Sequence, residues 1–262
     1  MRIYLASISP RRKEVLNSLG IKFSVLVPKV SEPISQYFNM FKGGNKFRLP
    51  RTKVAAGFSL RDKVKRNLKV AATTYYLFGG LQSMEYALVL ARLKVESVRR
   101  QIRNGIIIGM DTIVVLEKKI LGKPKNREDA KKMIAMLSNK THNVITGIYL
   151  LRLPDKKTAK GYELTKVKFR KLTNSEIEQY IKTNEPYDKA GAYGIQGKAG
   201  LFVESINGCY FNVVGFPVAK FLKLFKKLVG DTRKKSIYHR GHRKYRDWEG
   251  NETTRFHKIK TK

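Results

Sequence analysis

The first candidate for chemistry is a turn of small residues that leads into two adjacent arginines. Residues 6–12 read Ala-Ser-Ile-Ser-Pro-Arg-Arg and follow a short apolar run that predicts a strand. Unpaired backbone N–H groups and the helix dipole attract anions at the start of a helix, and arginine pairs well with phosphate oxygens. The segment therefore indicates an anion site, although an ordinary capped helix with solvated arginines has the same pattern.

The second candidate is a carboxylate in the motif Gly-Met-Asp-Thr at residues 109–112. Its aspartate, Asp111, directly follows an apolar run, and we expect it at the end of a strand over residues 106–109. Catalytic carboxylates often occupy this position in α/β sheets, where they bind a cation or activate water. An aspartate that caps a neighbouring amide in a turn is an equally common explanation.

Two further segments are rich in turn-forming residues. Lys123 stands between a glycine and a proline, which restrain its backbone but indicate little by themselves. Residues 185–197 interleave glycine and alanine with an acid, a base, aromatic residues and Gln196, and they carry little charge after Lys189. This composition favours a close-fitting ligand loop over a long surface loop.

The elements that would position these segments alternate between strands and helices. Apolar runs predict strands over residues 3–6, 23–27, 106–109, 113–116, 144–153 and 161–169. Helical spacing and capping residues predict helices over residues 10–19, 84–102, 126–137, 173–181 and 217–228. Asn207-Gly208, between two apolar runs, predicts a β-hairpin. We therefore expect an α/β chain with mixed strand connections.

Composition narrows the class of protein. A hydrophobic fraction of 42% is enough for a core, and a net charge of +35 attracts polyanions of any kind. The single cysteine, Cys209, excludes an internal disulfide framework and a cysteine-rich zinc site. No apolar stretch reaches the ~20 residues that span a bilayer, and no secretory signal is recognisable. We expect a soluble, cytoplasmic protein.

Taken in order, these segments resemble the Maf family of nucleoside triphosphate pyrophosphatases, which are relatives in fold of the inosine triphosphate pyrophosphatases. The matching stretches are LASISPRR, VLARLKVESV, IIIGMDTIVVLEKKILGKP, KTHNVITGI, EPYDKAGAYGIQGKAGLFVESINGCY and NVVGFPV. The resemblance implies a mixed, twisted sheet flanked by helices with a central nucleotide cleft. It also implies hydrolysis of a nucleoside triphosphate to the monophosphate and pyrophosphate with a divalent cation, expected to be Mg²⁺.

Within the family, the stretch DKAGAYGIQG is similar to the branch that prefers dTTP and UTP. The resemblance implies that Asp111 is the general base and that it holds the metal together with Glu32. The other site residues fall into two implied groups. Substrate selection falls on Arg11, Thr112 and Gln196, and phosphate binding falls on Ser7, Arg12, Lys94 and Lys123.

Two basic segments lie outside the family pattern. Residues 37–82 hold ten Lys or Arg residues and one acid, and residues 231–262 hold eleven and four. We expect a catalytic domain over residues 1–230, interrupted by a basic insertion at about 37–82 and followed by a disordered tail at 231–262. A tolerated surface segment or an error in the coding sequence explains the insertion more readily than a basic flap over the nucleotide entrance or an RNA-binding arm.

Two classes of function remain open from the sequence. One is a pyrophosphatase for dTTP, UTP or modified pyrimidine triphosphates, expected from the resemblance to act as a homodimer. The other is a nucleic-acid-binding protein that keeps the same fold without turnover. The four motif segments favour the enzyme, whereas the net charge of +35 favours nonspecific nucleic-acid binding.

Overall fold

The structure is a computed structural model, and it describes residues 1–30 and 81–230. Glu32, the expected metal ligand, lies outside the described residues. The expected tail at 231–262 also lies outside them, as does the expected insertion except for its last two residues. The described residues up to Leu228 pack as one unit, and this unit contains all the elements that position the site.

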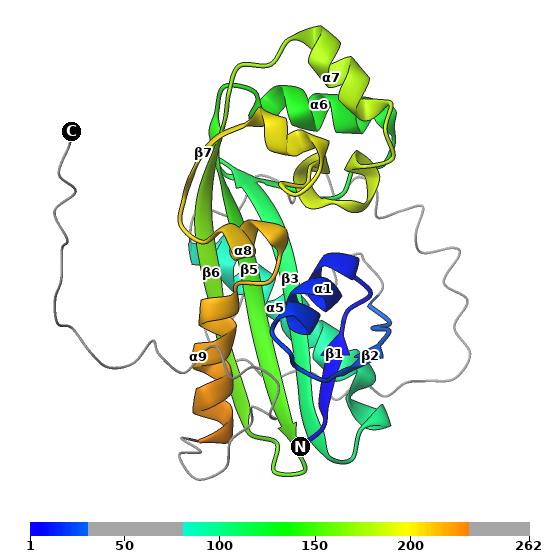
Figure 1. Ribbon diagram of the computed structural model, residues 1–262, viewed down its shortest axis with the longest axis vertical. Helices are drawn as coiled ribbons and strands as arrows, with labels where there is room; N and C mark the ends of the chain where they lie inside the picture. Colours follow the sequence, from blue (N-terminus) through cyan, green and yellow to red (C-terminus); the bar gives the residue numbers. More distant parts are fainter. Residues whose placement is uncertain (31–80, 231–262) are drawn as a thin grey trace, which may run out of the picture. The chain divides into compact units, whose positions relative to one another are not determined.

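One mixed sheet of seven strands forms the centre of the described part (Figure 1). Its strands are β1 (Ile3–Ala6), β2 (Ser24–Leu26), β3 (Gly105–Leu116), β4 (Lys119–Leu121), β5 (Thr141–Leu153), β6 (Thr158–Phe169) and β7 (Val203–Asn207). Their order is β2-β1-β3-β5-β6-β7, with β4 paired to β3. β1 is parallel to β2 and β3, and the remaining pairs are antiparallel. The predicted α/β class with mixed connections is confirmed.

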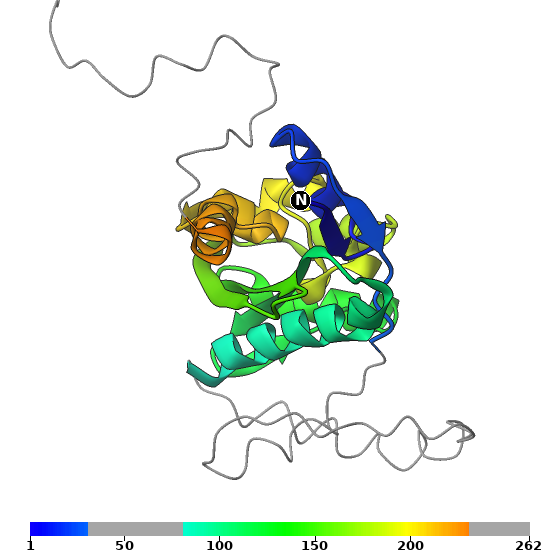
Figure 2. The ribbon, with the colours of Figure 1, turned by 90° about the horizontal axis from the view of Figure 1, so that it is seen from below.

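Helices cover both faces of this sheet. The α-helices are α1 (Pro10–Ser18), α5 (Leu81–Val98), α6 (Arg127–Leu137), α7 (Asn174–Ile181), α8 (Tyr210–Val214) and α9 (Val218–Val229). The short 3₁₀ helices are η1 (Arg99–Gln101), η2 (Pro186–Asp188), η3 (Ala190–Ala192) and η4 (Lys198–Phe202). α5 lies on one face, and α1, α8 and α9 lie on the other (Figure 2).

Local capping explains where two of these helices begin. The Asn126 side chain accepts a hydrogen bond from the backbone N–H of Asp129 at 2.9 Å, which starts α6. Thr173 and Glu176 form a reciprocal capping box at the start of α7. Both caps satisfy N–H groups that have no partner within the helix, and both were predicted from the sequence.

Two glycines allow α5 to lie directly on the sheet. A Cβ atom at Gly109 of β3 would lie 2.3 Å from the backbone oxygen of Ala91, and one at Gly147 of β5 would lie 2.3 Å from that of Ala87. Real Cβ atoms do not approach a backbone oxygen so closely, so only glycine fits these positions. The close approach carries Lys94 of α5 to the middle of β3.

The expectation that Asp111 ends a strand is wrong. The predicted strands at 106–109 and 113–116 are parts of one strand, β3, and Asp111 lies within it. β5 pairs with β3 from Gly105 to Val115, so the backbone partners continue through Asp111. β1, in contrast, pairs with β3 only as far as Ile108. Asp111 therefore lies just beyond the carboxyl end of β1, which keeps it at an edge of the parallel part of the sheet.

The predicted hairpin at Asn207-Gly208 is also wrong. The chain leaves β7 there, but the following apolar run forms the helix α8. Its buried Asn212 donates from Nδ2 to the backbone oxygen of Val144 at 2.9 Å and to Thr165 Oγ1 at 3.0 Å. A short apolar run has no distinctive period, so these contacts with β5 and β6 decide between strand and helix.

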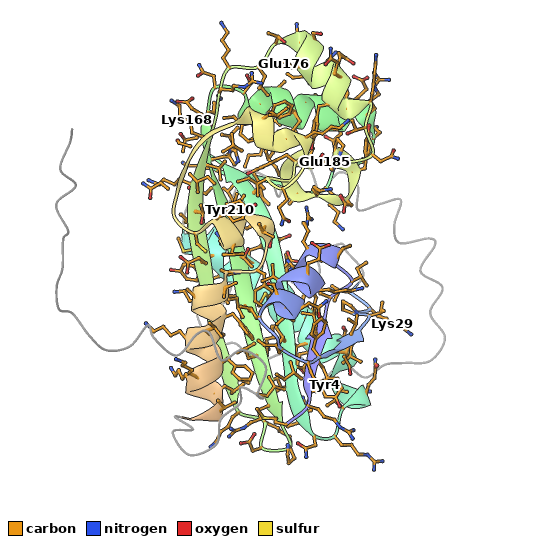
Figure 3. All side chains as sticks on the ribbon, in the orientation of Figure 1. Tyr4, Lys29, Lys168, Glu176, Glu185 and Tyr210 are labelled. Carbon is orange, nitrogen blue, oxygen red and sulfur yellow. The ribbon has the colours of Figure 1, made fainter. Side chains whose placement is uncertain are left out.

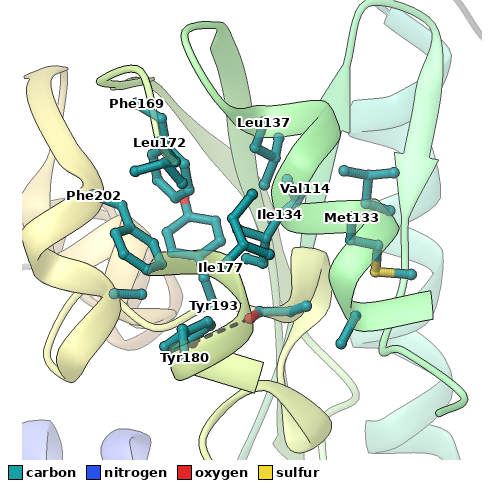
Figure 4. Close-up of a cluster of buried hydrophobic side chains, with 14 of the residues drawn as sticks. Val114, Met133, Ile134, Leu137, Phe169, Leu172, Ile177, Tyr180, Tyr193 and Phe202 are labelled. Carbon is teal, nitrogen blue, oxygen red and sulfur yellow. Dashed lines mark hydrogen bonds between the residues drawn. The ribbon is translucent and has the colours of Figure 1, made fainter. Parts of the chain in front are cut away.

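A buried cluster at the far end of β3, β5 and β6 supports the segment between α7 and β7. Phe169, Tyr193, Tyr180 and Phe202 pack edge to face in this cluster with side chains from α6 and α7 (Figure 4). The Tyr180 hydroxyl donates to the backbone oxygen of Ala192 at 3.1 Å. The glycine-rich stretch is thus anchored on a packed core instead of lying loose on the surface.

Candidate active site

Arg12, whose guanidinium is suited to binding phosphate, makes hydrogen bonds to several parts of the chain. It is buried on the first turn of α1, with 7% of its surface exposed. Its Nε donates to the backbone oxygen of Gly215 at 2.9 Å, Nη1 to Ser7 Oγ at 3.2 Å and Nη2 to Thr112 Oγ1 at 3.0 Å. Burial lowers the pKa of Arg12, and the negative charge of Asp111 opposes that effect. The guanidinium is therefore fixed by three separate parts of the chain.

Lys94 of α5 pairs directly with Asp111 of β3. Its Nζ donates to Asp111 Oδ1 and, at 3.2 Å, to the backbone oxygen of Met110. Burial lowers the pKa of Lys94, the charge of Asp111 raises it, and the charges of Arg12 and Lys123 lower it further. Three cationic side chains thus share the surroundings of one carboxylate.

Arg11 lies against the glycine-rich stretch. A Cβ atom at Gly194 would lie 3.1 Å from Arg11 Nη1 and 2.8 Å from the side chain of Lys189. The guanidinium of Arg11 and the side chain of Lys189 therefore lie directly against the backbone of Gly194. This contact brings the glycine-rich stretch next to the start of α1.

Glu185 closes the loop that carries Gln196, and sequence reasoning gave it no role. Its carboxylate accepts from the backbone N–H of Lys198 at 2.8 Å and from that of Ala199 at 3.3 Å. Its Oε1 also lies 3.1 Å from the Tyr180 hydroxyl, whose one proton it shares with the backbone oxygen of Ala192. In the view of Figure 3, Glu185 lies at the lower side of the group formed by α6, α7 and the 3₁₀ helices η2, η3 and η4. Asp188 and Lys189 also carry charge in this stretch, so charge in the sequence could not single out Glu185.

His142 supports the same loop from β5. Its Nε2 lies 2.7 Å from the Tyr193 hydroxyl, and both rings are buried. Burial lowers the pKa of His142 to about 4. The histidine is therefore neutral at pH 7 and acts here as a hydrogen-bonding part of the core.

This burial predicts a loss of stability in mild acid. Unfolded His142 binds a proton as the pH falls below about 6.5, whereas folded His142 stays neutral down to about pH 4. The free energy of unfolding should consequently decrease between pH 6.5 and 5. Urea denaturation across this range should give a smaller decrease for His142→Gln, and an equal decrease in both proteins would contradict the assignment.

The structure thus places most of the expected site residues, while their roles stay predictions. It brings five of them into two hydrogen-bonded groups, Arg12 with Ser7 and Thr112, and Lys94 with Asp111. The charges of Arg12 and Asp111 act on one another between these groups. The charge of Arg11 acts on Arg12, and that of Lys123 acts on Lys94, so both lie near these groups. Gln196 is exposed on the loop, two residues beyond Gly194, and no hydrogen bond or ion pair within the described residues joins it to Asp111.

The donor set can accept a magnesium ion but does not enclose one. No group of three or more His, Cys, Asp or Glu residues within the described ranges could hold a metal. Mg²⁺, however, is often held by one or two carboxylates together with substrate phosphates and water. Asp111 Oδ1 is paired with Lys94, which leaves Oδ2 for a cation or a water molecule. The residues present therefore fit a substrate-assisted magnesium site.

No helix in residues 1–30 or 81–230 combines the length and the hydropathy that crossing a bilayer requires.

Comparison with known proteins finds one family and several similarly named relatives that match this chain. The Maf-like protein family matches residues 2–228. The dTTP/UTP pyrophosphatase of Carboxydothermus hydrogenoformans is 41% identical over 223 residues, which cover 85% of this chain and 96% of the relative. That of Alkaliphilus metalliredigens is 40% identical over 227 residues, covering 86% and 95%. That of Clostridium botulinum (strain Okra) is 49% identical over 146 residues, covering 55% and 75%. The chain belongs to the Maf family.

Proposed function

We propose that this protein hydrolyses dTTP and UTP, or modified pyrimidine triphosphates, to the nucleoside monophosphate and pyrophosphate. Relatives named for this activity match most of the chain. The observation that carries the proposal is the pairing of Asp111 with Lys94 beside the buried Arg12. One carboxylate among fixed cations suits attack by water on a polyphosphate, and it has no purpose in a scaffold that only binds nucleic acid.

Asp111 is the proposed general base. Lys94 occupies Oδ1, so Oδ2 is the oxygen that accepts a proton from the attacking water. The oxygen of this water forms a bond to the α-phosphorus. The bond from the α-phosphorus to the oxygen that bridges to the β-phosphorus breaks, and pyrophosphate leaves with the electrons of that bond. Lys94 holds the carboxylate in one orientation, because α5 is pressed onto the sheet at Gly109.

Arg12 and Lys94 are the proposed phosphate ligands. Three of the five N–H groups of Arg12 are used by Gly215, Ser7 and Thr112, which leaves two for phosphate oxygens. Lys94 uses two of its three N–H groups and has one left. Donors that are already oriented stabilise the charge of the departing pyrophosphate without a reorganisation cost.

Asp111 and Glu32 are the residues proposed to hold Mg²⁺. When bound, the cation would neutralise phosphate charge and make water more acidic. The proposal further includes a cytoplasmic location, a homodimer and nonspecific contacts of the basic segments with nucleic acid. The last of these is supported by the charge of residues 37–82 and 231–262.

A panel of nucleoside triphosphates tests the proposed activity. Pyrophosphate release is measured with Mg²⁺ on the whole chain and on a version that lacks residues 37–82. Turnover of dTTP and UTP above the purine triphosphates supports the proposal. A salt-dependent affinity for RNA without turnover of any triphosphate would instead support the nucleic-acid-binding alternative.

Gln196 is the proposed reader of the pyrimidine base, because its amide can both donate and accept at the base edge. Replacing it by alanine or glutamate should change the ratio of kcat/KM for dTTP over dGTP about tenfold, roughly the effect of one lost hydrogen bond. The affinity for pyrophosphate, measured by calorimetry, should stay the same. An unchanged ratio of the two substrates would remove Gln196 from base selection.

A further inference from the structure

A chain of hydroxyl groups runs through the sheet behind Arg12. Thr112 of β3 and Thr146 of β5 are paired across the two strands, and their hydroxyl oxygens lie 2.9 Å apart. Arg12 Nη2 donates to the first, at 3.0 Å. Thr146 is completely buried, and its hydroxyl donates to the backbone oxygen of Asn212 in α8 at 3.3 Å.

The number of available protons determines which group donates and which accepts in each of these hydrogen bonds. A threonine hydroxyl has one proton, arginine can only donate, and a backbone oxygen can only accept. The proton of Thr146 is used on Asn212, so the proton of Thr112 must point to Thr146. Thr112 can then accept from Arg12 but has no proton left for a substrate.

We propose that Thr146 is a positioning residue for phosphate binding, acting on Arg12 through Thr112. This inference rests on the phosphate-binding role proposed for Arg12. Thr146 is buried and has no bond to Arg12, but it determines which way the Thr112 hydroxyl points. With Thr146 in place, the lone pairs of Thr112 face the guanidinium, and the remaining N–H groups of Arg12 keep one orientation toward the phosphate.

Thr165 of β6 provides a matched control. It is as buried as Thr146 and also holds α8: its hydroxyl accepts from Cys209 N at 3.1 Å and from Asn212 Nδ2 at 3.0 Å. It has no bond to Thr112 or Arg12 among the described contacts. Loosening of α8 reaches Arg12 only through Gly215, and it should appear in variants of both threonines. Loss of the Thr112 orientation should appear in Thr146 variants alone.

We expect Thr165→Val and Thr146→Val to differ in which property they affect more, the stability of the protein or its binding of phosphate. Thr165→Val leaves two buried N–H groups without an acceptor. Thr146→Val removes a donor from the backbone oxygen of Asn212, which still accepts from the N–H of Gly215 at 2.9 Å. We therefore expect Thr165→Val to lower the melting temperature more, and Thr146→Val to weaken phosphate binding more.

The experiment measures KM and kcat for dTTP and, separately, the calorimetric Kd for pyrophosphate. Thr146→Val should raise KM and the pyrophosphate Kd about fivefold, with a smaller change in kcat, because one of three contacts that orient Arg12 is weakened. Thr146→Ser, which keeps the hydroxyl, should restore both to within about twofold. Thr165→Val should leave both within about twofold of the wild type.

Three outcomes would overturn the proposal. They are a wild-type Kd and KM in Thr146→Val, an equal weakening in Thr165→Val, and a failure of Thr146→Ser to restore binding. If the wild-type chain binds pyrophosphate in a Thr146-dependent way but turns over no triphosphate, the positioning role holds and the proposed function fails. If it neither binds pyrophosphate nor turns over a triphosphate, both are wrong.

Discussion

Replacing Asp111 by asparagine should lower kcat for dTTP by about 10³-fold, within the range that general-base catalysis contributes. The amide oxygen can still accept from Lys94 Nζ, so the local geometry should persist while the proton acceptor is lost. Binding of dTTP is measured without Mg²⁺, because Asp111 is also proposed to hold the cation. Under that condition, removing one negative charge beside the bound polyanion should not weaken its binding. Steady-state kinetics and calorimetric binding of dTTP measure the two quantities separately.

A surface carboxylate serves as the control for this change. Asp155 lies in the turn between β5 and β6 and pairs with Arg152 at 2.6 Å. Asp155→Asn makes the same chemical substitution away from Lys94 and Arg12, and it should leave kcat unchanged. Turnover in Asp111→Asn close to that of the wild type would exclude Asp111 as the base.

Gly147→Ala should disrupt the packing of α5 against the sheet and destabilise the protein. Gly147 lies directly opposite Asp111 in the register of β3 and β5. An added Cβ would be 2.3 Å from the backbone oxygen of Ala87 and 2.5 Å from the backbone nitrogen of Leu88. Helix backbone cannot move aside like a flexible side chain, so the free energy of unfolding should fall by about 3 kcal/mol or more.

The same substitution should also reduce turnover. Lys94 is on the displaced helix, and its shift would break the pair with Asp111. Urea denaturation gives the stability, and dTTP hydrolysis at a temperature where the variant remains folded gives the activity. Gly122→Ala is the stability control, because an added Cβ there meets no atom within 4 Å. Equal unfolding free energies for Gly147→Ala and the control would show that α5 can move away at little cost.

Much of the secondary structure could be predicted from local features of the sequence, which involve only residues close together in the chain. The strand that leads into the turn before Arg12 and the caps at Asn126 and Thr173 were all predicted correctly. These features depend on neighbours in the sequence, such as the backbone N–H groups of a helix start. The family assignment also came from the sequence alone, because it required only the residues of the motifs and their order along the chain.

Tertiary structure alone decided how the site residues meet. Local pattern placed Asp111 at a strand end and Asn207-Gly208 in a hairpin, and both expectations failed because β5 and β6 supply partners from far along the chain. The roles of Thr146 and Glu185 were invisible for the same reason. A buried hydroxyl or carboxylate acquires its function from distant donors and acceptors, and packing of the whole unit brings those into range.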